Sequence, residues 1–192
     1  WVGFEKEGFR GHQYLLEEGE YHDWRAWGGC DSELRSVRVI RTDLSDPMVV
    51  LFEMSNEEVE EERTFEVTEA IPDVELFDFP TSTRSIHVIS GAWVAYSHVD
   101  YSGNQYVLEK GFYNNCADWG SGENRICSIQ PILPALTESQ VSRRELLLYT
   151  EPNFQGTCQV HCESEEFLSE RRTVQSCRVV GGRSVHSISM NP

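Results

Sequence analysis

The chain lacks the features that mark several classes of protein. Within its 192 residues no apolar run approaches the ~20 residues that a membrane-spanning helix needs. It has only 16 basic residues against 32 acidic ones, and the resulting net charge of -16 opposes binding to nucleic acids and to anionic membrane surfaces. No stretch sustains the i, i+3, i+4 apolar spacing of a long helix. The sequence therefore predicts a protein with little helix and with no nucleic-acid or membrane partner.

Cysteine is also too sparse to form a disulfide framework. There are six cysteines, and those in the repeated part of the chain do not recur, since Cys30 aligns with Gly122 and Cys116 with Trp24. We therefore expect free, mostly buried thiols in a reducing compartment, the cytoplasm. The chain begins at Trp1 without a basic or apolar leader. It is not predicted to be a secretory precursor, and we expect it to be a segment of a longer protein.

One internal repeat is the most informative feature that is present. Residues 1–40 align with residues 93–132 at a constant offset of 92, and thirteen of the forty aligned positions are identical. The identical residues are mostly those of turns and cores, and they include the pairs Gly11/Gly103, Tyr21/Tyr113, Trp27/Trp119 and Ser36/Ser128. A fixed period of this kind points to a repeated structural unit.

Short alternating segments separated by turn residues indicate strands. The clearest segments are 13–16, 36–40, 85–89, 105–108, 146–149 and 176–180. Many short strands without helices predict an all-β sandwich. A weaker repeat relates residues 85–91 to residues 176–182. The chain thus contains four repeat units of two types.

One hairpin signature recurs in three of these units. It consists of an aromatic residue, four residues, a second aromatic, one residue and a glycine, and it occurs at Phe4–Gly11, Tyr96–Gly103 and Tyr149–Gly156. We expect the glycine to adopt positive φ and the two aromatic rings to stack across the hairpin. In the remaining unit, residues 47–92, an acidic run at 57–62 replaces the signature. This run predicts a longer, solvated hairpin.

These features resemble the βγ-crystallin Greek-key motif. The resemblance rests on the aromatic hairpin, on a serine about 25 residues after that hairpin, and on the Trp-Val-x-Tyr sequence that begins at Trp93. It implies a βγ-crystallin Greek-key β-sandwich in which an A motif and a B motif form one domain. The chain is most similar to multi-domain, non-lens crystallin beta-gamma domain-containing proteins of the absent-in-melanoma type, of which it would be a fragment.

The resemblance also implies an order of motifs along the chain, B-A-B-A. It gives a B motif at 1–40 whose partner is missing, a linker at 41–46, a complete domain of A and B motifs at 47–132, a linker at 133–142 and a truncated A motif at 143–192. Each orphan motif would expose core residues by itself. We therefore expect pairing with other βγ-crystallin motifs, within the chain or between chains.

Many members of the family bind Ca²⁺ in a loop that ends on the repeated serine. The corresponding loops here are 31–36, 80–85, 123–128 and 171–176. Their fifth position, where the family carries a hydroxyl, is occupied by Arg35, Arg84, Cys127 and Gln175. A guanidinium opposes a cation, and a thiol is a soft ligand for an ion that takes ~6–8 oxygens.

The best remnant of a Ca²⁺ site is Glu123, Asn124 and Ser128, with Asp31 second. The sequence therefore predicts no cofactor, and Ca²⁺ binding that is weak at most. The serine that ends each loop, at positions 36, 85, 128 and 176, is expected to form hydrogen bonds that hold a folded hairpin.

Other patterns that could indicate chemistry favour a structural interpretation. Cys158, His161 and Cys162 are compatible with half a zinc site, but in a strand the histidine faces away from the thiols, so we expect buried core thiols. The pairs His22-Asp23 and His98…Asp100 are not repeated, and no nucleophile elbow, phosphate loop or HExxH motif is present. The resemblance makes Tyr21 and Tyr113 tyrosine corners, and Trp27 and Trp119 read as core residues.

The sequence thus predicts a non-catalytic structural or interaction protein. The resemblance implies a fragment of a larger cytoskeleton-associated, crystallin-like protein, with cytoskeletal proteins as possible partners. Two alternatives remain open at this point. One is a lens-type structural crystallin, and the other is a Ca²⁺-binding module with degenerate sites.

Overall fold

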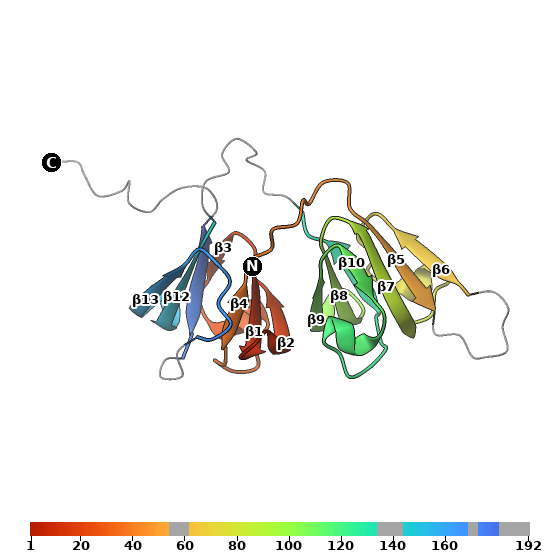
Figure 1. Cartoon of the computed structure of the whole chain (residues 1–192). Helices are drawn as coiled ribbons and strands as arrows, with labels where there is room; N and C mark the ends of the chain where they lie inside the picture. Colours follow the sequence, from red (N-terminus) through yellow and green to blue (C-terminus); the bar gives the residue numbers. More distant parts are fainter. Residues whose placement is uncertain (54–61, 134–143, 169–172, 181–192) are drawn as a thin grey trace. The chain divides into compact units, whose positions relative to one another are not determined.

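A computed structural model describes residues 1–53, 62–133, 144–168 and 173–180 (Figure 1). The strands are β1 (Val2–Lys6), β2 (Arg10–Leu15), β3 (Gly19–Tyr21), β4 (Ser36–Arg38), β5 (Met48–Glu53), β6 (Thr64–Val67), β7 (Thr83–Ser90), β8 (Trp93–His98), β9 (Ser102–Leu108), β10 (Gly111–Tyr113), β11 (Ser128–Pro131), β12 (Glu145–Glu151), β13 (Gln155–His161) and β14 (Ser176–Val180). The helices are single 3₁₀ turns, η1 (Trp24–Trp27), η2 (Val74–Phe77), η3 (Cys116–Trp119) and η4 (Pro152–Phe154).

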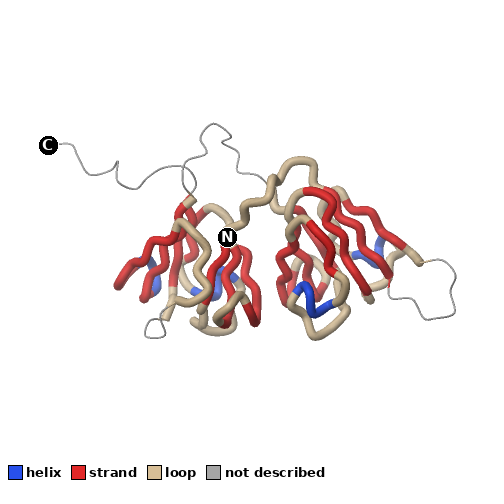
Figure 2. Tube along the Cα trace, viewed as in Figure 1, coloured by secondary structure: helices blue, strands red, loops and turns tan. Residues whose placement is uncertain are grey.

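Strands and their connections make up nearly all of the described chain (Figure 2). Each of the six segments predicted to be strands overlaps an observed strand, and the predicted all-β fold class is confirmed. The helices η1, η2 and η3 are each capped by the side chain of the residue before them. For example, the Asp23 carboxylate accepts a hydrogen bond from the Arg25 backbone N–H, and Gly28 ends the same turn in the left-handed region. No helix in the described ranges is long and apolar enough to cross a membrane.

The chain divides into two compact units. Unit 1 contains Trp1–Arg10, Tyr14–Val39 and Ala135–Pro192, and unit 2 contains Gly11–Gln13 and Ile40–Pro134. Unit 1 is thus built from segments near both ends of the chain, whereas unit 2 comes almost entirely from the middle.

Unit 2 is a sandwich of two antiparallel sheets. One sheet has the strand order β10-β7-β5-β6, and the other contains β11, β8 and β9 in that order. Apolar side chains from both sheets meet in one core, whose largest members are Trp93 and Trp119. The strand β10 follows β9 in the chain but pairs with β7. The second half of the unit, residues 93–132, therefore contributes one strand to the sheet of the first half. This exchange joins the two halves into one core.

Unit 1 is also a sandwich of two antiparallel sheets, which correspond to those of unit 2. One has the order β13-β12-β14-β3, and the other contains β2, β1 and β4 in that order. Its core combines Trp1, Trp27 and Val37 from the first segment with Leu146 and Leu148 from the last segment. The strand β3 pairs with β14, as β10 pairs with β7 in unit 2. The segment 1–40 therefore shares its core with residues 145–168 and 173–180.

The chain order in the two units is reversed, but their contacts correspond. In unit 1 the exchanged strand β3 precedes its partner sheet in the chain, whereas in unit 2 the strand β10 follows it. A bridge between Val37 and Glu165 in unit 1 matches the bridge between Ile129 and Ile71 in unit 2. The two units therefore form equivalent sandwiches, although their two halves follow one another in opposite order along the chain.

Several sequence predictions fall on residues that the structure does not describe. The backbone between β4 and β5 is irregular, and it contains the predicted linker 41–46. Of the acidic run at 57–62 only Glu62 is described, and of the predicted linker 133–142 only Leu133 is described. The predicted motif order and domain boundaries remain predictions.

Candidate functional site

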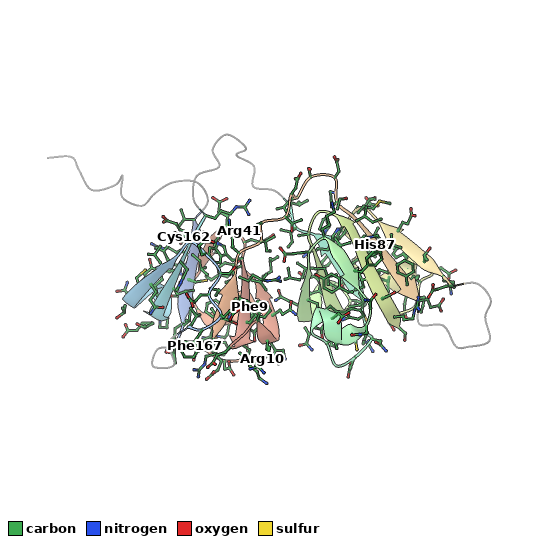
Figure 3. The ribbon with its side chains drawn as sticks, viewed as in Figure 1. Phe9, Arg10, Arg41, His87, Cys162 and Phe167 are labelled. Atoms are coloured by element: carbon green, nitrogen blue, oxygen red, sulfur yellow. The ribbon has the colours of Figure 1, made fainter. Side chains whose placement is uncertain are left out.

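The three hairpins with the aromatic signature fold in the same way. The rings of Phe4 and Phe9 have centroids 5.6 Å apart, those of Tyr96 and Tyr101 5.8 Å, and those of Tyr149 and Phe154 5.7 Å. The predicted contact between the two rings is present in all three, but the ring planes are inclined at 56°, 67° and 67°, so the rings meet tilted or edge to face and are not stacked. The glycines at positions 11, 103 and 156 have φ of 81°, 82° and 77°, which confirms the predicted positive φ. Phe9, labelled in Figure 3, occupies the turn of the first hairpin.

The second aromatic residue of each hairpin also lies in the left-handed region. Phe9, Tyr101 and Phe154 have φ of 58°, 56° and 62°. This conformation costs a residue with a side chain roughly 1–2 kcal/mol. The hairpins therefore need a further interaction that holds these residues in place, and the sequence alone did not reveal this requirement.

A buried serine hydroxyl supplies that interaction. It accepts a hydrogen bond from the backbone N–H of the left-handed aromatic and donates one to a carbonyl at the end of the preceding strand. The partners are Phe9 and Lys6 for Ser36 (3.1 and 2.6 Å), Tyr101 and His98 for Ser128 (3.0 and 2.6 Å), and Phe154 and Glu151 for Ser176 (3.0 and 2.6 Å). The predicted structural role is confirmed for these three serines, whereas the hairpin facing Ser85 lies outside the described residues.

The tyrosine corners are present in both units. The Tyr21 hydroxyl accepts a hydrogen bond from the Glu17 backbone N–H, and the Tyr113 hydroxyl accepts one from the Glu109 backbone N–H, both at 2.9 Å. Burial raises the pKa of Tyr21 above its ordinary value of 10.0. Both phenols pack against the core of their unit, so these groups serve folding and are not arranged for stacking a ligand.

The loop at 123–128 does not bring its candidate ligands together. The hydroxyl of Ser128 is fully buried and bonded within the hairpin, and the carbonyl oxygen of Asn124 accepts a hydrogen bond from the Thr83 N–H at 2.8 Å. Glu123 is exposed, and its backbone N–H and carbonyl are bonded to the Ser121 hydroxyl. The Ser128 hydroxyl is therefore committed to the hairpin, and the Asn124 carbonyl oxygen is shared with the Thr83 N–H.

Charged side chains of the loop at 31–36 interact with groups of the same loop. The Asp31 carboxylate accepts a hydrogen bond from the Glu33 backbone N–H at 2.9 Å. The Arg35 guanidinium forms an ion pair with Glu33, with Nε 2.9 Å from the carboxylate oxygen. A permanent cation therefore already neutralises a carboxylate in this loop. Within the described residues, no three His, Cys, Asp or Glu side chains form a metal-binding group.

The two histidine–aspartate pairs have separate structural partners. The His22 ring lies 4.9 Å from the Phe154 ring, while Asp23 caps η1. The His98 Nδ1 lies 2.8 Å from the Ser97 hydroxyl, and the backbone N–H of Asp100 donates to the Pro72 carbonyl oxygen. Neither pair forms the aligned acid–base arrangement that catalysis would require.

The prediction that the cysteines are mostly buried is wrong. Only Cys127 and Cys177 are buried, whereas Cys30, Cys158 and Cys162 are exposed. The register of β12 against β13 explains the exposure of Cys158. Leu146 and Leu148, which face the core, stand opposite His161 and Gln159. The intervening positions on β13, including that of Cys158, therefore point out of the sandwich. Cys162, labelled in Figure 3, directly follows β13.

The same register places polar groups at the edge of the core of unit 1. Where β6 of unit 2 directs Phe65 and Val67 inward, β13 directs Gln159 and His161 inward. The Nε2 atom of His161 is buried and has no hydrogen-bond partner in the described ranges. Burial lowers the pKa of His161 below 6.5, against the opposing effect of Glu165. The sequence predicts that His161 lies on the face opposite the thiols, which is confirmed, and that the thiols face the core, which is wrong, because His161 occupies the inner face.

A pocket beside β13 is too small for a ligand. It is lined by residues that include Leu148, Gln159 and Val174, and its free volume of about 10 Å³ accommodates roughly one water molecule. Small-molecule sites usually enclose ~300–1,000 Å³. This pocket therefore does not provide a substrate site.

Comparison with known proteins gives consistent matches. Residues 1–40 and 49–132 match the family described as Beta/Gamma crystallin. The chain is 52% identical, over 95% of its length, to "Beta/gamma crystallin domain-containing protein 2" of Homo sapiens, of which it covers 11%. It is 35% identical, over 68% of its length, to "Beta-crystallin B1" of Sus scrofa, of which it covers 52%. The chain therefore spans a small part of the first relative and about half of the second.

A solved structure of a related domain is also similar. It is described as the fifth crystall domain of the non-lens protein Absent in melanoma 1, and its sequence is 28% identical to this chain. The match covers 50% of this chain and 99% of that chain, with a TM-score of 0.38. The family match and the 52% identity to a curated relative confirm the resemblance to crystallin beta-gamma domain-containing proteins that the sequence indicated.

Removing the serine hydroxyl should destabilise its hairpin. Ser128→Ala leaves the Tyr101 N–H and the His98 carbonyl without their partner, and we expect the free energy of unfolding of unit 2 to fall by about 2–3 kcal/mol. Urea denaturation followed by tryptophan fluorescence measures this change. Ser102→Ala is the matched control, because that hydroxyl is exposed and bonds only Val99 in the same hairpin. Equal losses in the two variants would contradict the role of Ser128.

Acid should weaken unit 1 through His161. Because its pKa is lowered in the folded state, the unfolded chain takes up a proton first as the pH falls through about 6.5. The free energy of unfolding should therefore be independent of this group above pH 6.5 and decrease below it. His161→Gln should remove that part of the pH dependence, measured by denaturation between pH 7.5 and 5.5. The exposed His12→Gln is the control, and an unchanged slope in His161→Gln would refute the assignment.

Proposed function

Because the chain belongs to the beta/gamma crystallin family, we propose that it is a non-catalytic structural and interaction protein. We propose further that it is part of a larger, cytoskeleton-associated, crystallin-like protein. The 52% identity to a relative of which the chain covers 11% supports a larger parent. The Greek-key sandwich expected for the family is confirmed, whereas the order B-A-B-A of its motifs stays a prediction.

One observation carries the non-catalytic role: the candidate groups for chemistry are engaged in folding. Ser128 holds a hairpin, Asp23 caps a helix, and Tyr113 binds the backbone. A catalytic site needs reactive groups that converge on a substrate-sized pocket. The described residues provide neither feature at these positions.

The exposed apolar side chains support a role in association. The large ones include Leu76, Phe77, Phe112, Val160 and Phe167. Phe112 stacks on His87, labelled in Figure 3, with ring centroids 3.7 Å apart on the outer face of a sheet of unit 2. Aromatic residues are enriched where proteins bind other proteins. We therefore propose other crystallin motifs and cytoskeletal proteins as partners.

We propose a cytoplasmic location for the same protein. All six cysteines are free of disulfide bonds, and three of them are exposed. Exposed thiols persist in a reducing compartment. The excess of acidic residues opposes nucleic-acid and membrane partners.

Cosedimentation tests the cytoskeletal role. The full chain is centrifuged with actin filaments, with microtubules and with intermediate filaments, at low and at high salt. We expect saturable pelleting with one filament type that persists at high salt, because apolar contacts are not screened by ions. Pelleting with none of the three would contradict cytoskeletal association and leave the structural role to be judged separately by light scattering.

For Ca²⁺ we propose that the degenerate loops bind weakly at most. Arg35 is paired within one loop, and the Ser128 hydroxyl of the other is committed to its hairpin. Calorimetric titration of the full chain with CaCl₂ should give no saturable heat at micromolar concentrations. Ser128→Ala should behave identically in this titration. A micromolar isotherm that Glu123→Gln abolishes would overturn the proposal.

A lens-type structural role is the second candidate. The observation that favours it is the 35% identity to a beta-crystallin B1 over 68% of the chain. A protein with this role should remain clear at high concentration and should not pellet with filaments. The cosedimentation experiment therefore separates the two candidates.

A further inference from the structure

The strand β13 forms an edge of its sheet. The order β13-β12-β14-β3 places β12 on one side of it, and no strand in the described ranges pairs with its other side. It is seven residues long, and most of its residues are exposed. An edge strand of this length presents backbone N–H and C=O groups that can pair with another strand.

This edge lacks the features that normally prevent pairing. Residues 155–162 contain no Asp, Glu, Lys, Arg or Pro, although the chain has a net charge of -16. The equivalent edge strand of unit 2, β6, is only four residues long and carries the exposed Glu66. Charges and short lengths on an edge are the usual protection against association. Unit 2 has this protection, and β13 does not.

The outer face of β13 is symmetric about one residue. The Cys158 and Val160 positions point away from the core, and Cys162 follows two residues later, so the thiols flank Val160 at equal spacing. Val160 has an exposed fraction of 55%. If a second β13 pairs antiparallel with the first about an axis at Val160, each Cys158 stands opposite a Cys162 of the other copy. Two like-charged chains are then joined along a neutral strand.

We propose that β13 pairs antiparallel with β13 of a second copy of this chain, with Val160 at the twofold axis. The inference rests on the proposed role in association and identifies one surface for it. Opposed residues in an antiparallel pair have Cα atoms about 4.5 or 5.5 Å apart, and both values lie within the range of about 4.4–6.8 Å that a disulfide bridges. Within one chain, four residues of strand separate the two thiols by roughly 13 Å. A Cys158–Cys162 disulfide therefore reports pairing between copies.

Oxidative cross-linking tests the register. The azo oxidant diamide removes two hydrogens from the two thiols, which join as a disulfide, and is itself reduced to the hydrazine. In a Cys30→Ser background, non-reducing electrophoresis and peptide mass spectrometry should find a dimer with the Cys158–Cys162 link. Cys158→Ser alone and Cys162→Ser alone should each lower this dimer by about tenfold or more, since every link needs both residues.

Mixing the two single variants provides the rescue. A chain that keeps only Cys162 can still be linked to a chain that keeps only Cys158, so the mixture should regain a cross-linked heterodimer. Loss in each single variant with recovery in the mixture is the signature of the proposed register. Cross-linking that is equal in both single variants and in the parent would overturn it.

A charge at the axis tests pairing without oxidation. Val160→Lys places two ammonium groups opposite each other, and it should weaken the dimer by about tenfold or more in sedimentation under reducing conditions. Leu76→Lys is the control, because Leu76 is 75% exposed and lies in unit 2. Circular dichroism of Val160→Lys must match the parent, so that loss of the dimer is not loss of the fold.

The outcomes separate this inference from the proposed function. A dimer that persists in Val160→Lys and gives no Cys158–Cys162 link overturns the inference but leaves self-association through another surface, such as exchange of residues 1–40 between copies. A chain that is monomeric at all concentrations overturns the inference and removes self-association from the proposed role, while filament binding is judged by cosedimentation.

Discussion

The fold depends on a buried serine hydroxyl in each aromatic hairpin. The hairpin reverses its direction over a left-handed aromatic residue, a conformation that is unfavourable by itself. The hydroxyl of Ser36, Ser128 or Ser176 bonds the amide of that residue and a carbonyl of the strand before it, so it closes the fold on both sides. The two aromatic rings also contact each other, edge to face in the hairpin of Tyr96 and Tyr101. This arrangement explains why the serine recurs although no ligand site is built around it.

The second constraint is that half a sandwich cannot bury its own apolar face. In unit 2 the halves follow one another in the chain, and in unit 1 they come from the two ends of the described chain. The bridges Val37–Glu165 and Ile129–Ile71 occupy equivalent places in the two units. At the surface of unit 1, Arg178 adds an ion pair with Glu20 and lies over the Phe154 ring, but such exposed pairs add little stability. The shared core, including Leu146 and Trp27, therefore holds the segments together.

The sequence predicts local features of this fold well, because they recur. Contacts between the hairpin aromatics, positive-φ glycines, tyrosine corners and buried tryptophans each appear in more than one unit. The burial of the cysteines could not be predicted in the same way. Alternation shows that Cys158 and His161 occupy opposite faces, but the register against β12 decides which face is buried, and that register is a long-range property. The sequence leads us to expect that the orphan motifs pair, but it leaves open whether they do so within one chain or between two, and the shared core of unit 1 shows pairing within the chain. The structural role of Ser128 is also predicted from its recurrence, and the two hydrogen bonds of its hydroxyl confirm that role.

The register of β13 links the stability of unit 1 to its surface. A strand has two faces, so placing Gln159 and His161 inside necessarily places the Cys158 and Val160 positions outside. In β6 the same inward positions carry Phe65 and Val67, which bury apolar surface at the edge of the core. The edge of unit 1 thus gains less from apolar burial than the edge of unit 2. A second strand laid against β13 would satisfy its free backbone groups without any change in the core. The register of β13 therefore has two effects: it lowers the apolar burial at this edge of unit 1, and it places the neutral face that suits association on the outside.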